Sequence, residues 1–184
     1  MPAATTKIFE KGKVWTLSNF MSLSRIILAV VLYFVILERQ TLLALLISFV
    51  AVITDYADGW FARKLNQVSE LGKILDPIAD KMAVGLGSIA LHYAYGLPGW
   101  VVVIILGRDI LILLGSLLIL GKKKMVIASA WPGKIAVTLI SFLLISYFTT
   151  FETLKLVLEI AAVLGIFYSL GYYFWVFIKN FKNN

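Results

Sequence analysis

The chain has 184 residues, of which 61% are hydrophobic, and its formal net charge is +7. Soluble domains are typically about 45–50% apolar. The excess here falls in long runs that a soluble core of this length cannot bury, so lipid is the expected solvent. The basic residues lie between these runs, which points to anionic headgroups and membrane topology and argues against nucleic acid as a partner. There is no cysteine, which excludes disulfide bonds.

Residues 1–18 precede the first long apolar run and mix apolar side chains with lysines. Residues 6–18 predict a short amphipathic helix in the membrane interface, and a solvated tail is the alternative. No short apolar core followed by a small-residue cleavage site is present, so we expect no cleavable signal peptide.

Six apolar segments follow, each long enough to cross a bilayer as a helix, which takes roughly 20 residues. Helices are favoured because backbone polar groups in lipid must find partners within their own segment. We therefore expect an all-α integral membrane protein with one transmembrane domain over residues 19–184. The predicted spans are 19–37, 42–63, 73–95, 98–120, 134–150 and 154–178.

Turn signals separate these spans, and charge orients them. "ERQ" (38–40) is a polar turn, "GLPG" (96–99) joins a helix stop to a proline start, and "WPGK" (131–134) opens the fifth span. Most cations, Arg25 included, fall on one side of the membrane, while Arg39 and Lys155 fall on the other. The positive-inside rule then places both termini and the linker between spans two and three in the cytoplasm, and we expect a bacterial inner membrane.

Four of the ten acidic residues lie in the stretch "DYADGWFARKLNQVSELGKILDPIAD" (55–80). Asp55 and Asp58 are three apart near the end of the second span, and Asp76 and Asp80 are four apart at the start of the third. Each pair shares one face of its helix. The linker between them is short, so the two helices should be antiparallel neighbours and the four carboxylates should converge.

Like charges at that density repel one another, and a charge buried in a bilayer costs several kcal/mol. Divalent cations among the aspartates would remove this conflict. Oxygen ligands favour hard ions, so the sequence predicts Mg²⁺ or Mn²⁺ and not zinc. The alternative is a solvated charged loop with unrelated helix ends.

Small and basic residues accompany the aspartates. Gly59 and Gly72 flank the linker, where glycine lets backbone approach a ligand closely, and Ala62 is small on the same logic. Arg63 suits a bidentate contact with phosphate. For each glycine taken alone, helix packing is an equally good explanation.

The complete pattern, D-x2-D-G-x2-A-R-x8-G-x3-D-x3-D, resembles the signature of the CDP-alcohol phosphotransferases, and every fixed position is present. The resemblance implies six transmembrane helices, two divalent cations and a homodimer, although no part of the sequence marks an interface. It implies that Asp80 is the general base. The implied metal ligands are Asp55, Asp58, Asp76 and Asp80. The residues implied to line the pocket for the CDP group are Asp58, Gly59, Ala62, Arg63 and Gly72.

"GKILDPIADK" (72–81) and "TLSNFMSLSRI" (16–26) resemble the phosphatidylglycerophosphate synthases and the related cardiolipin synthases. The implied reaction transfers the phosphatidyl group of CDP-diacylglycerol to a polar alcohol, first of all glycerol 3-phosphate, and releases CMP. Cardiolipin synthesis with phosphatidylglycerol as acceptor is the alternative. A divalent-cation transporter ranks third, because transport sites lie near the bilayer midplane and these carboxylates lie toward one face.

An acceptor that carries a phosphate needs cations, and Lys81, Arg108 and Lys134 are the candidates. Arg108 is the strongest candidate, because an arginine inside the fourth span is costly unless it binds a polar or charged group. An ion pair is the alternative, but the adjacent Asp109 is expected to point elsewhere on the helix. Two departures favour the cardiolipin synthase branch or a less specialised relative. Asp109 stands where phosphatidylglycerophosphate synthases often have glutamate, and Ser116 stands where they often have a second arginine.

Overall fold

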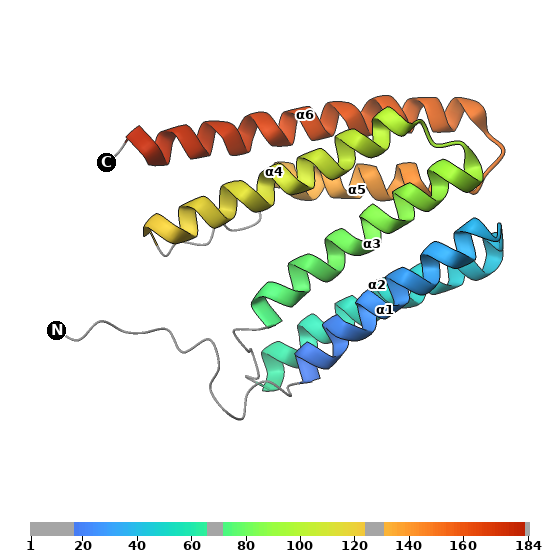
Figure 1. Ribbon diagram of the computed structural model, residues 1–184, viewed down its shortest axis with the longest axis horizontal. Helices are drawn as coiled ribbons and strands as arrows, with labels where there is room; N and C mark the ends of the chain where they lie inside the picture. Colours follow the sequence, from blue (N-terminus) through green and yellow to red (C-terminus); the bar gives the residue numbers. More distant parts are fainter. Residues whose placement is uncertain (1–16, 66–71, 124–130, 183–184) are drawn as a thin grey trace. The chain divides into compact units, whose positions relative to one another are not determined.

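A computed structural model describes residues 17–65, 72–123 and 131–182 of the chain. Within these ranges the side chains of residues 55–65, 72–77 and 115–123, and of several residues near the two ends, are not described. The predicted interfacial helix over residues 6–18 lies outside the described residues except for its last two, which belong to the first helix. The described residues form six α-helices and no strand (Figure 1): α1 (Leu17–Leu37), α2 (Thr41–Leu65), α3 (Gly72–Tyr95), α4 (Gly99–Lys123), α5 (Trp131–Ser146) and α6 (Glu152–Lys182).

The predicted turns are confirmed, with local causes. Arg39 adopts a left-handed conformation with φ 56°, and the amide of Gln40 donates to the carbonyl of Val35 at 3.1 Å, which terminates α1 at the "ERQ" turn. Gly96, with φ 78°, terminates α3, and glycine adopts this conformation without steric cost.

The fifth helix differs from its predicted range of 134–150, because α5 begins at Trp131 and ends at Ser146. Pro132 lies in the first turn, where its missing N–H costs nothing and its fixed φ suits a helix. At the other end, the amides of Phe148 and Thr149 donate to the carbonyls three residues back, at 3.1 and 2.9 Å. This tighter pattern closes the helix before the predicted end.

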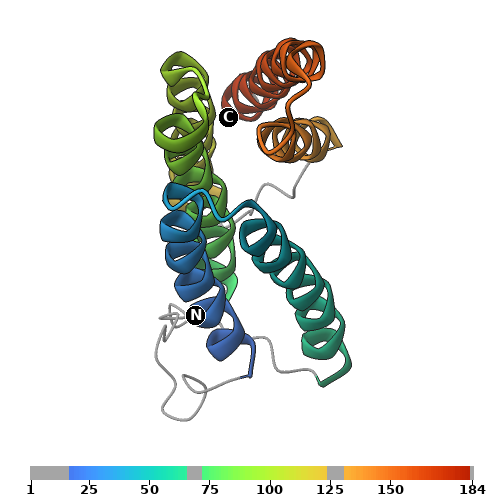
Figure 2. The ribbon, with the colours of Figure 1, turned by 90° about the vertical axis from the view of Figure 1, so that its right-hand side faces the viewer.

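The chain divides into two compact units, Met1–Ala90 and Leu91–Asn184. In the first unit, α1 and α2 form an antiparallel hairpin whose helices diverge away from their connecting turn (Figure 2). The buried positions of α1 recur three, four and seven residues apart, which is one face of a helix. They are Ser22, Arg25, Ala29 and Ile36.

In the second unit, α6 packs against both α5 and α4. Small residues allow α5 and α6 to approach closely: a Cβ on Gly165 would lie 2.8 Å from Leu139 Cδ1, and a Cβ on Gly133 would lie 2.6 Å from Tyr173 Oη. Such contacts are typical of helices that associate by van der Waals packing. The close packing places Gly133, at the start of α5, against α6. Ser169, on the same helix α6, is fully buried.

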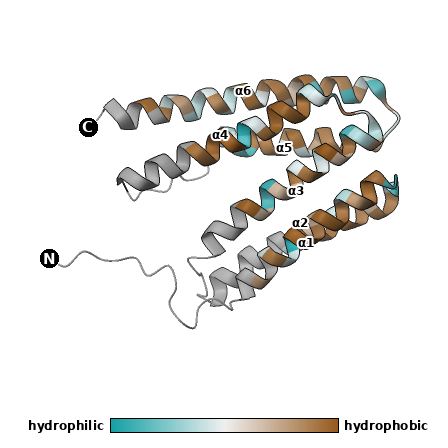
Figure 3. Ribbon diagram, in the orientation of Figure 1, coloured by the Kyte–Doolittle hydropathy of each residue, from teal (hydrophilic) through white to brown (hydrophobic). Residues whose placement is uncertain are grey.

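Large apolar side chains are exposed on most helices. Apolar residues, drawn in brown, make up much of the coloured parts of α1, α2, α5 and α6 (Figure 3). Among the described residues, only Glu152–Val176 of α6 forms a helix long and apolar enough to cross a membrane, and the protein buries 22% of its most apolar window. Shorter apolar helices cover Ser22–Leu37, Thr41–Thr54 and Trp131–Ser146. The six predicted spans therefore stay a prediction, although the six helices themselves are present.

Candidate functional site

The aspartate motif lies on α2 and α3, as predicted. Asp55 and Asp58 lie in the last part of α2, and Asp76 and Asp80 lie in the first turns of α3, which begins at Gly72. Of the eight motif positions, only Asp80 has a described side chain. The side chains at the other positions lie outside the described residues: Asp55, Asp58, Gly59, Ala62, Arg63, Gly72 and Asp76.

The convergence of four carboxylates therefore remains a prediction. The described side chains include no group of three or more histidine, cysteine, aspartate or glutamate residues that could hold a metal ion. Three of the four predicted ligands are not among those side chains, so this observation does not bear on the predicted metal site.

Asp80 is the one predicted catalytic residue whose surroundings are described. Its Oδ1 accepts a hydrogen bond from Nη1 of Arg25 at 2.8 Å, and this ion pair joins α3 to α1. The Arg25 side chain is 9% exposed and that of Asp80 is 61% exposed. A buried guanidinium is costly without a carboxylate partner, and here that partner is the more exposed member of the pair.

From the sequence, Arg25 was interpreted as a topology cation and as part of the family-like stretch "TLSNFMSLSRI" (16–26), but no role at the site was predicted for it. Its contact with Asp80 places it at the predicted general base. The signal that could have found it is the one used for Arg108, an arginine inside an apolar helix.

Two of the three basic residues that were predicted to bind the phosphate of the acceptor are not deeply buried. Lys81 follows Asp80 on α3 and is partly exposed. Lys134 is exposed near the start of α5, and its Nζ lies 5.7 Å from the centroid of the Trp131 ring, within the range of a cation–π contact.

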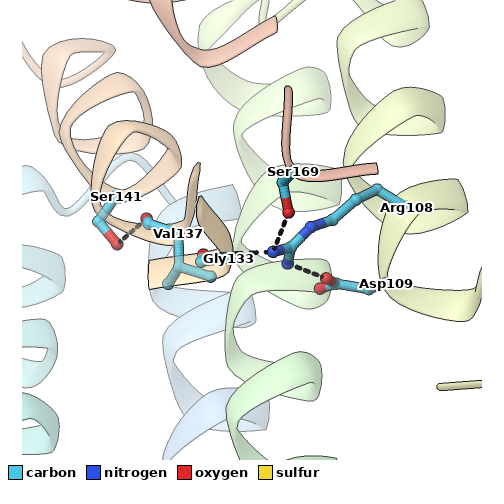
Figure 4. A network of polar contacts seen from close by, with 6 residues as sticks. All are labelled: Arg108, Asp109, Gly133, Val137, Ser141 and Ser169. Atoms are coloured by element: carbon cyan, nitrogen blue, oxygen red, sulfur yellow. Dashed lines mark hydrogen bonds and ion pairs between the residues drawn. The ribbon is translucent and has the colours of Figure 1, made fainter. Parts of the chain in front are cut away.

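Arg108, the third, is buried in the second unit and belongs to a polar network (Figure 4). Its Nη1 donates to Oδ1 of Asp109 at 2.6 Å, and the two side chains are 7% and 13% exposed. Its Nη2 makes two longer contacts, to the carbonyl oxygen of Gly133 at 3.3 Å and to Oγ of Ser169 at 3.5 Å. Three helices thus meet at one guanidinium.

The expectation that Asp109 points away from Arg108 is wrong. Adjacent residues on a helix do not face each other. The arginine side chain is nevertheless long enough to fold back across that separation, and a buried guanidinium gains most from the nearest carboxylate.

One N–H group of the buried Arg108 guanidinium makes no hydrogen bond to a described residue. Nε of Arg108 is buried and has no hydrogen-bond partner among the described residues. A buried donor without a partner is costly, whereas guanidinium edges suit bidentate contact with phosphate or carboxylate oxygens. Arg108 therefore has both a counter-ion and an edge that is suited to an anion.

Gly133 and Ser169 contact Arg108 but were not predicted. No local pattern marks them, because their role depends on the packing of α5 and α6 against each other. Pro132 and Gly133 mark a helix start in the sequence, but they do not indicate which side chain lies against it.

Comparison with known proteins bears on most of the chain. A family model described as CDP-alcohol phosphatidyltransferase matches residues 15–170. The CDP-diacylglycerol–glycerol-3-phosphate 3-phosphatidyltransferase of Aquifex aeolicus is 35% identical over 130 residues, which are 70% of this chain and 72% of that protein. The human cardiolipin synthase (CMP-forming) is 38% identical over 113 residues, 61% of this chain and 37% of that protein.

A third relative, the CDP-diacylglycerol–glycerol-3-phosphate 3-phosphatidyltransferase of Bacillus subtilis, is 41% identical over 86 residues, 47% of this chain and 44% of that protein. The chain thus spans most of the Aquifex relative and less than half of the human and Bacillus relatives. The family match includes the complete aspartate motif and Arg108, and it covers most of the sequence. The chain therefore belongs to the CDP-alcohol phosphatidyltransferase family.

Proposed function

We propose that the protein is a membrane enzyme that transfers the phosphatidyl group of CDP-diacylglycerol to glycerol 3-phosphate and releases CMP. The observation that carries this proposal is the family match over residues 15–170, together with the Aquifex relative, whose name states this donor and this acceptor. Arg108 supports the acceptor, because a buried arginine with an unused edge suits a phosphate group.

A membrane location is supported by the surface of α6. A core helix of a soluble protein is mostly buried, whereas the most apolar window of α6 is 22% buried. Its exposed side chains include Leu156, Ile160, Leu164 and Phe167, which recur at helical spacing. We propose that lipid covers this face and that the motif lies on the cytoplasmic side.

We propose that Asp55, Asp58, Asp76 and Asp80 hold two divalent cations, Mg²⁺ or Mn²⁺. The donor set fits such ions, because it consists of carboxylate oxygens at helical spacing in a chain without cysteine. When bound, the ions would neutralise the pyrophosphate of the donor and charge on the departing CMP. Gly59, Ala62, Arg63 and Gly72, with Asp58, would line the pocket for the CDP group.

In the proposed reaction Asp80 accepts the proton of the acceptor hydroxyl. The hydroxyl oxygen attacks the phosphorus of the phosphatidyl group, a new P–O bond forms, and the bond to CMP breaks. Arg25 orients the base through its 2.8 Å contact with Oδ1. Arg108, with Lys81 and Lys134, would hold the phosphate of the acceptor.

Cardiolipin synthesis is the second candidate, and the human relative's name favours it. The two reactions differ in the acceptor, since phosphatidylglycerol has no phosphate monoester. Cation transport has no comparable support, because membership of a phosphatidyltransferase family points to group transfer.

An acceptor assay tests the proposal. The purified chain in detergent micelles is given CDP-diacylglycerol, Mg²⁺ or Mn²⁺, and either glycerol 3-phosphate or phosphatidylglycerol. CMP release is measured, and the lipid product is identified by thin-layer chromatography. We expect phosphatidylglycerophosphate and no reaction after EDTA treatment. A product formed only from phosphatidylglycerol would replace the first candidate by the second. Activity unaffected by EDTA would exclude the metal proposal.

A further inference from the structure

Ser169 differs from other serines in the described helices. Ser48, Ser88, Ser141 and Ser146 each donate a hydrogen bond to a backbone carbonyl three or four residues earlier. This is the usual arrangement for a serine inside an apolar helix. Ser169 is fully buried, yet the one hydrogen bond of its side chain in the described part of the chain is with Nη2 of Arg108, from which it accepts.

The hydroxyl hydrogen of Ser169 is therefore left to donate elsewhere. A hydroxyl group has one donor and two acceptor sites. A buried donor without an acceptor costs free energy, and the described residues supply no acceptor for this hydroxyl, so Ser169 is suited to a bound partner.

The unused donors of Arg108 lie beside this hydroxyl. Asp109 binds Nη1, so the Nε–Nη2 edge remains, with Nε lacking a partner among the described residues and Nη2 making only long contacts of 3.3 and 3.5 Å. The two hydrogens of Nη2 are shared with the Gly133 carbonyl and Ser169 Oγ, and an oxyanion on this edge would take the hydrogen that now makes the longer, 3.5 Å contact with Ser169. In Figure 4, Ser169 and Gly133 lie on the Nη2 side of the guanidinium and Asp109 lies below it.

We propose that Ser169 is an acceptor-binding residue whose hydroxyl, together with the Nε–Nη2 edge of Arg108, binds the phosphate monoester of the acceptor. The inference rests on the proposed function for the identity of that acceptor. Arg108 supplies charge and two donors, and Ser169 supplies a third donor. The arrangement suits a phosphate group with several terminal oxygens better than the phosphodiester of phosphatidylglycerol.

Ser169→Ala tests the proposal, because it removes one oxygen atom and keeps the small residue that α6 needs at this position. Ser141→Ala is the matched control: Ser141 lies on α5, is exposed, and donates to the Val137 carbonyl at 3.0 Å without contacting Arg108. We expect Ser169→Ala to raise the KM for glycerol 3-phosphate about tenfold, the effect of losing one hydrogen bond to a charged group. The KM for CDP-diacylglycerol should change less than about twofold, and the control should match the wild type.

A binding measurement separates this inference from the proposed function. Inorganic phosphate and glycerol 3-phosphate are titrated into the full chain in detergent micelles without donor lipid, and binding is followed by calorimetry. We expect the dissociation constants of both to rise about tenfold in Ser169→Ala. Equal constants in wild type and variant, or no binding to the wild type, would overturn the inference. Weakened phosphate binding in the variant, with a wild type that uses only phosphatidylglycerol, would support the phosphate site and overturn the proposed acceptor.

Discussion

Two buried arginines, Arg25 on α1 and Arg108 on α4, each pair with an aspartate at hydrogen-bonding distance, and the pairs differ in what they connect. Arg25 binds Asp80, 55 residues away and 61% exposed. Arg108 binds its neighbour Asp109, which is 13% exposed. The first pair joins two helices at a carboxylate that remains accessible. The second is local, and it fixes the direction of the guanidinium while its other edge contacts α5 and α6.

The difference indicates two uses of a buried arginine in an apolar protein. In the first pair the buried arginine holds a carboxylate that is itself exposed, so we infer that the arginine positions the carboxylate. In the second pair the aspartate is largely buried, and its negative charge balances part of the charge of the buried Arg108 guanidinium. Substitutions at the four residues should therefore have effects of different size and kind.

Asp80→Asn should give the largest effect. The amide cannot act as a base, so CMP release should fall by about 10³-fold or more, within the range for loss of general base catalysis. Binding of a cytidine nucleotide, measured by calorimetry, should persist and show that the protein is folded. Turnover near the wild-type rate would remove Asp80 from the role of base.

Arg108→Ala should give the second-largest effect. Loss of a charged, bidentate donor should raise the KM for glycerol 3-phosphate about 100-fold, with a much smaller change in the KM for CDP-diacylglycerol. Steady-state CMP release at varied acceptor and donor measures both. Lys155→Met, which removes a cation that pairs with Glu152 at the start of α6, is the control and should have little effect. Equal changes for the two substrates would contradict an acceptor-binding role.

Arg25→Ala should lower kcat about tenfold, because Asp80 loses the contact that orients it while keeping its carboxylate. Arg25→Lys retains a cation and should recover most of the activity. Arg39→Ala removes an exposed cation from the α1–α2 turn and serves as the comparison. A kcat as low in Arg25→Lys as in Arg25→Ala, with both proteins folded by circular dichroism, would mean that charge alone does not position Asp80.

Asp109→Asn should give the smallest effect. Asparagine keeps an oxygen that can accept from Nη1 of Arg108, so the guanidinium should keep its direction and the KM for glycerol 3-phosphate should change by less than about threefold. Asp109→Ala removes that oxygen and should raise this KM more than the asparagine variant does. If alanine and asparagine raise this KM equally, Asp109 acts through its charge and not by positioning Arg108.

The lengths of the apolar runs and the turn signals between them were sufficient to predict six helices, because apolar runs and Gly or Pro punctuation are local properties. The fifth helix was misplaced because the predicted start passed over the first turn that Pro132 opens, and because the tight turn after Ser146 has no strong breaker residue. The family was also predictable, since eight spaced motif positions leave few alternatives, and the match over residues 15–170 confirms it.

The sequence by itself determined the helical architecture, the family and the residue types available for metal and phosphate binding, because each depends on spacing along one chain. Only the tertiary structure decided which groups meet: Arg25 with Asp80, and Arg108 with Asp109, Gly133 and Ser169. The physical reason is that a buried donor takes the acceptors that packing brings to it. That packing depends on small contacts such as Gly133 against Tyr173, which no local pattern records.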